Sequence, residues 1–100
     1  MFFVIHGIDK PGHGEVRAGA RPAHLEYMKN AADRLIVAGP TLSEDGESMT
    51  GSLIIIEAED RAEAEAFTRD DPYTQAGLFE SVTIKPWKLV FARDQNESGA

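Results

Sequence analysis

Hydrophobic positions follow a period of two in some segments of the chain and a period near 3.6 in another. Residues 2–8 and 51–57 are short runs rich in β-branched and aromatic side chains, which is typical of strands. Over residues 22–37 the apolar positions instead recur at intervals of three and four, which predicts a helix with one apolar stripe. That stripe consists of Leu25, Met28, Ala32, Leu35 and Ile36.

Proline and glycine set the expected limits of this helix. Pro22 suits the first helical turn, where its missing N–H costs no hydrogen bond. A start as early as Glu15, with a kink at the proline, is the alternative. The Ala-Gly-Pro segment at residues 38–40 should stop the helix. A short strand over residues 39–43 is a weaker prediction, and the Asp-Gly pair at residues 45–46 indicates a hairpin turn.

A second helix is predicted over residues 61–69. Asp60 precedes it as an N-cap residue, with Glu63 three positions further on, as in a capping box. The helix should end before Asp71, because the residue before a proline avoids the helical region. The side chains expected to face the core are those of Ala62, Ala66 and Phe67.

The remaining segments complete an α+β arrangement. Residues 73–79 indicate a short helical turn that ends near Gly77, and residues 82–91 a last strand. The order β-α-β-β-α-β is the ferredoxin-like arrangement, with both helices on one face of the sheet. One hundred residues suit one domain. We therefore expect a single domain over residues 1–93 and a flexible polar tail over residues 94–100.

The predicted strands carry apolar side chains on both faces. In the first strand, Phe3 points to one face and Val4 to the other. Ile54 and Ile55 do the same in the third strand. Two helices can cover only one face, and an uncovered apolar face of this size is unusual for a monomer. We therefore expect a twofold dimer with facing sheets, a dimeric α+β barrel, with higher assembly open. The alternative is a monomer with apolar residues at ragged strand ends.

The charge balance narrows the range of partners. The chain has 10 basic and 17 acidic residues, a formal net charge of −7. Phosphate backbones and anionic lipids should repel it, so we expect neither nucleic-acid binding nor membrane binding. The chain has no cysteine, no apolar stretch near ~20 residues and no signal-peptide pattern at its N-terminus. We expect a cytoplasmic protein.

His24 and Asp71 are the candidate pair for chemistry. His24 lies near the start of the first predicted helix, and Asp71 follows the second. If the two helices pack side by side and antiparallel, these ends meet, and the carboxylate can orient the imidazole as a general base. The alternatives are structural roles: packing or capping for His24, and an Asp-Pro pair at residues 71–72 that begins a turn.

Other polar residues give weaker signals. Arg17 and Arg21, four residues apart, could hold an anionic substrate group, or they are simply solvated charges. His6 and His13 lack the spacing of metal ligands, and without thiols a metal site is not expected. The glycines around His13 lack the lysine of a phosphate-binding loop, and the serines show no nucleophile-elbow pattern.

Several short segments, spread in order over residues 1–92, resemble the YciI-like (YCII-related) family. They are Arg21-Pro22-Ala23-His24-Leu25, Ala38-Gly39-Pro40, Thr50-Gly51-Ser52, Asp71-Pro72-Tyr73, Ala76-Gly77 and Lys85-Pro86-Trp87. The resemblance implies a dimeric ferredoxin-like subunit with His24 and Asp71 as its active-site pair. Some members of the family look like enzymes that eliminate chloride from a chlorinated aromatic, and the fold is similar to that of muconolactone isomerases.

These observations support two hypotheses about function. The first is a cofactor-free enzyme in which His24 is the general acid or base and Asp71 orients it, for elimination or isomerisation of a small cyclic or aromatic substrate. The second is a non-catalytic dimeric module that binds a small molecule or supports a larger enzyme. We expect a second copy and a small molecule as partners, and no cofactor or metal. The expected substrate-binding residues are Arg17, Arg21, Gly39, Pro40 and Tyr73.

Overall fold

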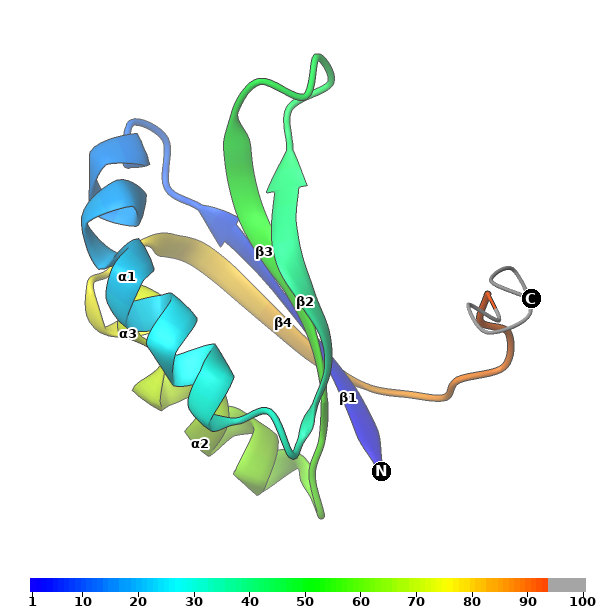
Figure 1. The fold of residues 1–100 in the computed structure, drawn as a ribbon. Helices are drawn as coiled ribbons and strands as arrows, with labels where there is room; N and C mark the ends of the chain where they lie inside the picture. The colour runs from blue at the N-terminus through cyan, green and yellow to red at the C-terminus, as the bar shows by residue number, and fades with distance from the viewer. Residues whose placement is uncertain (94–100) are drawn as a thin grey trace.

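The computed structural model describes residues 1–93, which form one antiparallel sheet with helices on one face (Figure 1). The predicted tail, residues 94–100, lies outside the described residues. Residues 1–93 contain four strands and three helices. In chain order these are β1 (Phe2–Asp9), α1 (Gly14–Asn30), β2 (Leu35–Leu42), β3 (Met49–Glu57), α2 (Arg61–Asp70), α3 (Pro72–Gln75) and β4 (Phe79–Trp87). The predicted ferredoxin-like order is confirmed.

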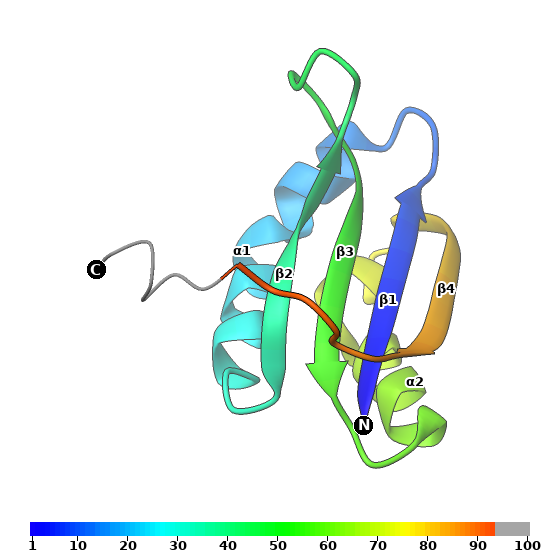
Figure 2. The same cartoon turned by 90° about the vertical axis from the view of Figure 1, so that its right-hand side faces the viewer.

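The strand order in the sheet is β2-β3-β1-β4, so β1 and β3 lie at the centre (Figure 2). All three pairings are antiparallel. At the centre, Ile5 of β1 lies opposite Ile54 of β3 and Ile84 of β4. Because side chains alternate along a strand, this row faces the helices and its neighbours face the other way.

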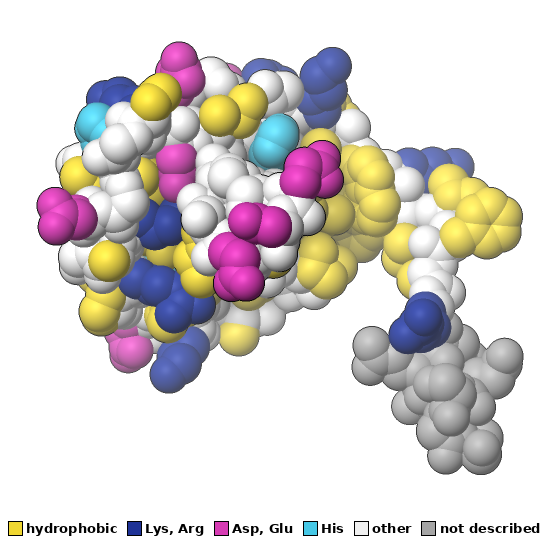
Figure 3. Space-filling model, turned by 90° about the horizontal axis from the view of Figure 1, so that it is seen from above, with side chains coloured by type: hydrophobic (Ala, Val, Ile, Leu, Met, Phe, Trp, Pro, Cys, Tyr) yellow, Lys and Arg dark blue, Asp and Glu magenta, His cyan; other side chains and the backbone are white. Residues whose placement is uncertain are grey.

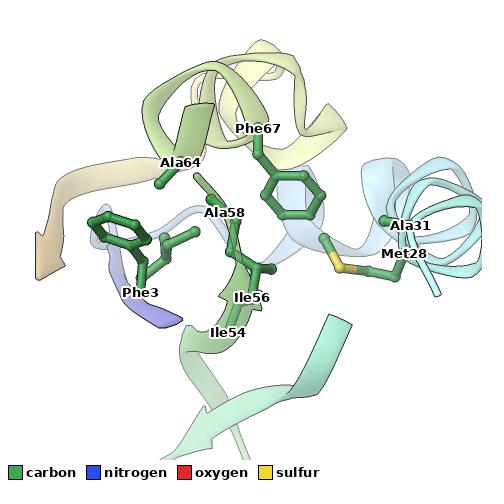
Figure 4. Packing of buried hydrophobic residues seen from close by; sticks show 9 residues of the cluster. Phe3, Met28, Ala31, Ile54, Ile56, Ala58, Ala64 and Phe67 are labelled. Atoms are coloured by element: carbon green, nitrogen blue, oxygen red, sulfur yellow. The ribbon is translucent and has the colours of Figure 1, made fainter. Parts of the chain in front are cut away.

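The core fills the space between the sheet and the helices (Figure 4). Phe3 and Ile56 from the sheet pack there with Met28 of α1 and Phe67 of α2. Full burial of such a side chain stabilises the fold by about 1.5–3 kcal/mol. The inward face of α2 is formed by Ala64 and Phe67, not by Ala62 as predicted; Ala62 is exposed. The Asp60 cap is confirmed by a 2.9 Å bond from the Glu63 N–H.

The first helix begins earlier and ends earlier than predicted. α1 starts at Gly14, close to the alternative start at Glu15, and Pro22 lies inside it. A proline there removes one intrahelical hydrogen bond but has not ended the helix. Leu35 and Ile36, which the helical period assigned to α1, lie in β2 instead. Short apolar runs fit either period, and Leu35 gains strand pairing with Ile56 of β3, whereas Ile36 lies at an irregularity of the pairing.

The Ala-Gly-Pro segment at residues 38–40 is not a helix stop; it belongs to β2. Ala38 lies opposite Ile54, and Pro40 lies opposite Ser52. A proline is tolerated there because β2 is an edge strand of the sheet. The small side chains of this edge leave space between β2 and α1, which becomes important at the site.

The last strand also differs from the prediction, since β4 covers Phe79–Trp87 rather than residues 82–91. Residues 88–93 leave the sheet and extend away from its uncovered face (Figures 1 and 2). Their apolar side chains are exposed, and Phe91 has 92% of its surface accessible. The predicted short helical turn is present as α3, followed by Gly77 at a φ of 73°.

The face of the sheet away from the helices carries apolar side chains, as predicted, but also the polar side chains of His6, Thr83 and Lys85. Phe2, Val4 and Leu53 lie on it, with Trp87 from β4 against the ring of Phe2. Leu53 and Trp87 keep 37% and 36% of their surfaces accessible. Figure 3 shows hydrophobic side chains gathered on this side of the molecule, towards the C-terminal segment. Within residues 1–93, no helix is long and apolar enough to cross a membrane.

Candidate functional site

A cavity of about 420 Å³ opens between α1 and the β2–β3 side of the sheet. It exists because the small residues at positions 38–40 of β2 do not fill the space beneath α1. Its walls are mostly apolar, and its polar groups come chiefly from α1. The lining residues include Met28, Leu35, Ala38 and Ile54 among the apolar ones, and Arg17, Arg21, His24, Lys29, Ser52 and Tyr73 among the polar ones.

His24 and Asp71 meet at this cavity. The Nδ1 atom of His24 lies 2.8 Å from Oδ1 of Asp71, and the residues are 8% and 2% exposed. His24 lies in the middle of α1 rather than near its start, because the helix begins ten residues earlier, at Gly14. Asp71 lies between α2 and α3, as expected. The structure therefore brings the predicted pair together, but His24 contacts Asp71 from the middle of α1 and not from its first turn.

A hydrogen bond to the backbone of the next helix holds the carboxylate of Asp71 in place. Its Oδ1 atom accepts the backbone N–H of Tyr73 at 2.9 Å, which caps the first turn of α3. Pro72 occupies the first position of α3, where its lack of an N–H costs nothing. The same oxygen that caps α3 therefore also bonds the imidazole of His24. Rotation of the carboxylate would break both bonds.

This bond orients the imidazole of His24. An ionised carboxylate can only accept, so Nδ1 donates, and a neutral ring then carries its free electron pair on Nε2. His24 lines the cavity, whereas Asp71 does not. The edge of the ring that a bound molecule can reach is therefore the Nε2 edge. A basic nitrogen held at the wall of an apolar cavity can accept or return a proton.

Tyr73 holds the face of the same imidazole. The two rings are stacked, with centroids 3.9 Å apart and an interplanar angle of 16°. The guanidinium carbon of Arg17 lies 4.5 Å from the centroid of the Tyr73 ring. Burial raises the pKa of Tyr73 above its usual value, against the opposing charges of Arg17 and Arg21. The phenol is therefore neutral at neutral pH.

Arg17 is a buried cation held by three hydrogen bonds. It donates to both carboxylate oxygens of Asp9, at 2.7 and 3.0 Å, and to Oγ of Ser52 at 2.9 Å. Burial alone lowers the pKa of Arg17, but the hydrogen bond and charge of Asp9 outweigh it, so the pKa is raised. The fork geometry fixes the guanidinium in one plane. This arrangement suits Arg17 to a supporting role beneath Tyr73.

Sequence reasoning missed Asp9 and Ser52. Asp9 ends β1 and Arg17 lies eight residues on, so only the folded loop between them creates the pair. Ser52 did carry a signal. It alternates with Ile54 and Ile56 on the helix-facing side of β3, so a polar side chain there must find a buried partner.

The other predicted residues divide into two groups. Arg21, Gly39 and Pro40 line the cavity, as does Lys29, which was not predicted. His6 lies on the uncovered face of the sheet, and His13 precedes α1 with Nδ1 3.0 Å from the Pro11 carbonyl. Neither of these histidines lines the cavity. Within residues 1–93, no three His, Asp or Glu side chains gather as metal ligands.

A ferredoxin-like α+β domain with a buried His–Asp pair beside an apolar cavity is thus the class that fold and site define. The chain belongs to the YCII-related domain family, whose pattern matches residues 1–88. It is similar to the protein YciI of Escherichia coli O6:H1, with 40% identity over 98 positions that cover 91% of this chain and 100% of that protein. An uncharacterized protein of Haemophilus influenzae is 37% identical over the same coverage.

Solved structures give the same picture of the fold. The 5-chloro-2-hydroxyhydroquinone dehydrochlorinase of Burkholderia phenoliruptrix, in complex with 2,5-dihydroxybenzoquinone, superposes with a TM-score of 0.81. It is 40% identical, and the match covers 88% of this chain and 94% of that one. An antibiotic biosynthesis monooxygenase, at 14% identity and a TM-score of 0.56, covers 90% of this chain and 99% of its own. At that identity it shares the fold alone.

Proposed function

We propose that this protein is a cofactor-free enzyme that transfers protons on a small cyclic substrate, with His24 as the general base and acid. The observation that carries the proposal is the 2.8 Å contact between His24 and Asp71 at the wall of the cavity. A buried carboxylate behind an imidazole holds its tautomer and stabilises the cation that forms when the ring takes a proton. That is the arrangement a general base needs.

The chemistry needs no oxidant or reductant. Nε2 of His24 takes a proton from a C–H or O–H group of the substrate, and the electron pair of that bond moves into the substrate ring. In an elimination from a hydroxylated ring, the imidazolium of His24 first returns that proton to the ring carbon that carries the leaving group. A second hydroxyl group then gives up its proton and forms a C=O bond, and the leaving group departs with its bonding pair. In an isomerisation, the imidazolium of His24 returns the proton at another carbon. In both cases Asp71 orients the imidazole of His24 through the bond to Nδ1.

Two further observations support elimination from a ring. The cavity of about 420 Å³ falls in the usual range for small-molecule sites, and the side chains of Met28, Leu35 and Ile54 offer apolar walls. The relative of known structure with 40% identity is by name a dehydrochlorinase of a chlorinated hydroxyhydroquinone. We extend that reaction class, elimination from a substituted ring, to this chain.

The test is turnover of chlorinated hydroxyhydroquinones, followed as chloride release and as product absorbance. We expect His24→Gln to lower kcat by about 10²–10⁴-fold, the usual contribution of a general base. Asp71→Asn should lower kcat as well, because the ring loses its fixed tautomer. His13→Gln is the matched control, since His13 precedes α1 and does not line the cavity.

The outcomes separate catalysis from binding. Unchanged turnover in a folded His24→Gln variant would contradict the proposal. A protein that binds the ring compounds but converts none of them would favour the alternative, a non-catalytic small-molecule-binding or accessory module. Circular dichroism and urea denaturation show which variants are folded before their activities are compared.

A further inference from the structure

The cavity is basic although the chain is acidic. The charged side chains that line it are those of Arg17, Arg21 and Lys29, and no carboxylate of residues 1–93 is among the lining side chains. The chain as a whole carries a formal net charge of −7. Figure 3 shows several Lys and Arg side chains close together on the helix side of the molecule. Basic groups concentrated in a cleft of an acidic protein attract an anionic ligand.

The three cations are not equivalent. Arg17 is paired with Asp9 through two hydrogen bonds and is 5% exposed, so most of its charge is compensated within the protein. Arg21 and Lys29 are exposed at the cavity. Within residues 1–93, neither has a carboxylate oxygen within 4.0 Å. The uncompensated positive charge of the site therefore belongs to Arg21 and Lys29.

Arg21 is the cation nearest to the reacting group along the helix. It precedes His24 by three residues on α1, so the two side chains share one face of the helix, about 5–6 Å apart at Cβ. Its charge also lowers the pKa of the Tyr73 phenol, against the larger effect of burial. The positive field of Arg21 thus acts on the polar end of the cavity, beside the ring of His24.

We propose that Arg21 determines substrate class by binding an ionised hydroxyl oxygen attached directly to the substrate ring. This inference rests on the proposed function, because it assigns the ligand of the same site. Arg21 and His24 are one helical turn apart, so the anionic oxygen and the atom that loses the proton must be close together in the ligand. A ring oxygen meets this requirement, while the ring itself contacts Met28 and Ile54.

The assignment also separates the roles of the two arginines. Arg21 binds the ligand, whereas Arg17 is a positioning residue that supports the Tyr73 ring against His24. A substitution at Arg21 should therefore change affinity for anions with little effect on stability, because Arg21 is exposed. A substitution at Arg17 should change stability first, because it leaves Asp9 without its partner.

Calorimetric titration of the purified protein with matched quinones tests the inference. The probe is 2,5-dihydroxybenzoquinone, whose hydroxyl groups are ionised at neutral pH, and the neutral comparison is 2,5-dimethoxybenzoquinone. We expect the wild type to bind the anion at least about tenfold more tightly, as a charge-assisted hydrogen bond predicts. Arg21→Gln should remove most of this preference, Arg21→Lys should restore part of it, and added salt should reduce it.

The control variant is Arg69→Gln, which removes an exposed cation of α2 that does not line the cavity. It should leave both affinities unchanged. Equal binding of the two quinones, no binding of the anion, or an unaltered preference in Arg21→Gln would overturn the inference. Binding of benzoate in place of the dihydroxyquinone would also overturn it, since the anion would then be a carboxylate rather than a ring oxygen.

Failure here is distinguishable from failure of the proposed function. His24→Gln should keep the preference for the anionic quinone while losing turnover, because binding of the anion depends on Arg21. In Arg21→Gln the preference for the anionic quinone should be lost, while turnover at saturating substrate is retained. KM then rises and kcat does not change, as expected of a residue that determines specificity. A fall in kcat alone at saturating substrate, with the preference intact, would overturn the role of Arg21.

Discussion

The ring of Tyr73 lies stacked on the imidazole of His24, 3.9 Å away at the centroids and tilted by only 16°. Asp71 restrains the same imidazole within its plane, through the bond to Nδ1. One contact thus limits tilting of the ring and the other limits its rotation. Since the Tyr73 N–H also bonds Asp71, a single short segment of chain, residues 71–73, supplies both restraints.

Tyr73→Leu should cost the domain about 2–4 kcal/mol of unfolding free energy, because Tyr73 is 1% exposed and a smaller side chain leaves a cavity. Tyr73→Phe keeps the stack and should cost clearly less. Urea denaturation measures both values. Turnover should follow the same order, with Tyr73→Leu impaired more than Tyr73→Phe. If the two variants were equally active, the stack would have no role in positioning His24.

The raised pKa of Tyr73 predicts a specific loss of stability at high pH. The unfolded chain releases its tyrosine protons near pH 10, the ordinary value, while the folded chain holds them to higher pH. Between those two values only the unfolded state is deprotonated, so the free energy of unfolding falls as pH rises. Tyr27, whose pKa burial also raises, should contribute in the same direction.

Urea denaturation between pH 8 and pH 11 measures this effect. Tyr73→Phe and Tyr27→Phe should each reduce the fall in the free energy of unfolding with pH. For each variant, the difference in this free energy from the wild type at pH 8 serves as the reference. Lysines titrate in the same range but are common to all three proteins, so they cancel in the comparison. A fall of the same depth in Tyr73→Phe would show that the phenol of Tyr73 does not carry the predicted linkage.

The Arg17–Asp9 pair should show strong coupling. Arg17→Met leaves the Asp9 carboxylate without its cation in a mostly buried place, which should cost about 3–5 kcal/mol. Asp9→Leu leaves the guanidinium unpaired and should cost a similar amount. The double variant should cost much less than the sum, since neither charge is then stranded. Additive losses in a double-mutant cycle from urea denaturation would contradict this account.

The sequence allowed the order of elements and the identity of the His–Asp pair to be predicted, but not the face that α1 buries. The predicted stripe ran through Leu25 and Met28, whereas the buried side chains of α1 are those of Arg17, His24 and Met28. Periodicity arguments assume that apolar residues mark the inward face. Here two polar residues face inward because Asp9 and Asp71, distant in sequence, satisfy them. Leu25 is exposed, at the mouth of the cavity.

The end of α1 illustrates a second limit. Leu35 and Ile36 continued the helical period, yet they lie in β2, whose pairing with β3 begins at Leu35. The local hydrophobic pattern contains no information about that long-range pairing, so it could not show that the strand is more stable than one more helical turn. The same strand places residues 38–40 opposite α1, so the cavity itself depends on an element that the sequence predicted only weakly. The roles of Asp9 and Ser52 depend on the same long-range geometry.

The uncovered face of the sheet leads to the last prediction, a dimer with facing sheets. Phe2, Val4, Leu53 and Trp87 lie on this face together with His6 and Lys85, and residues 88–93 extend outward from it with Phe91 almost fully exposed (Figures 1 and 2). Pairing two such surfaces stabilises the dimer by about 25 cal/mol of free energy for each Å² of apolar area buried. Light scattering at micromolar concentration should give about twice the chain mass of 10.9 kDa.

Leu53→Lys places a charge in the middle of this surface and should convert the dimer to a monomer, because burying an unpaired ammonium is costly. Ala62→Lys, on the exposed side of α2, adds the same charge elsewhere and should leave the mass unchanged. The wild type running as a monomer at micromolar concentration would contradict the prediction. A Leu53→Lys variant that stays dimeric would move the interface away from this face of the sheet, since a buried lysine could not remain unpaired there.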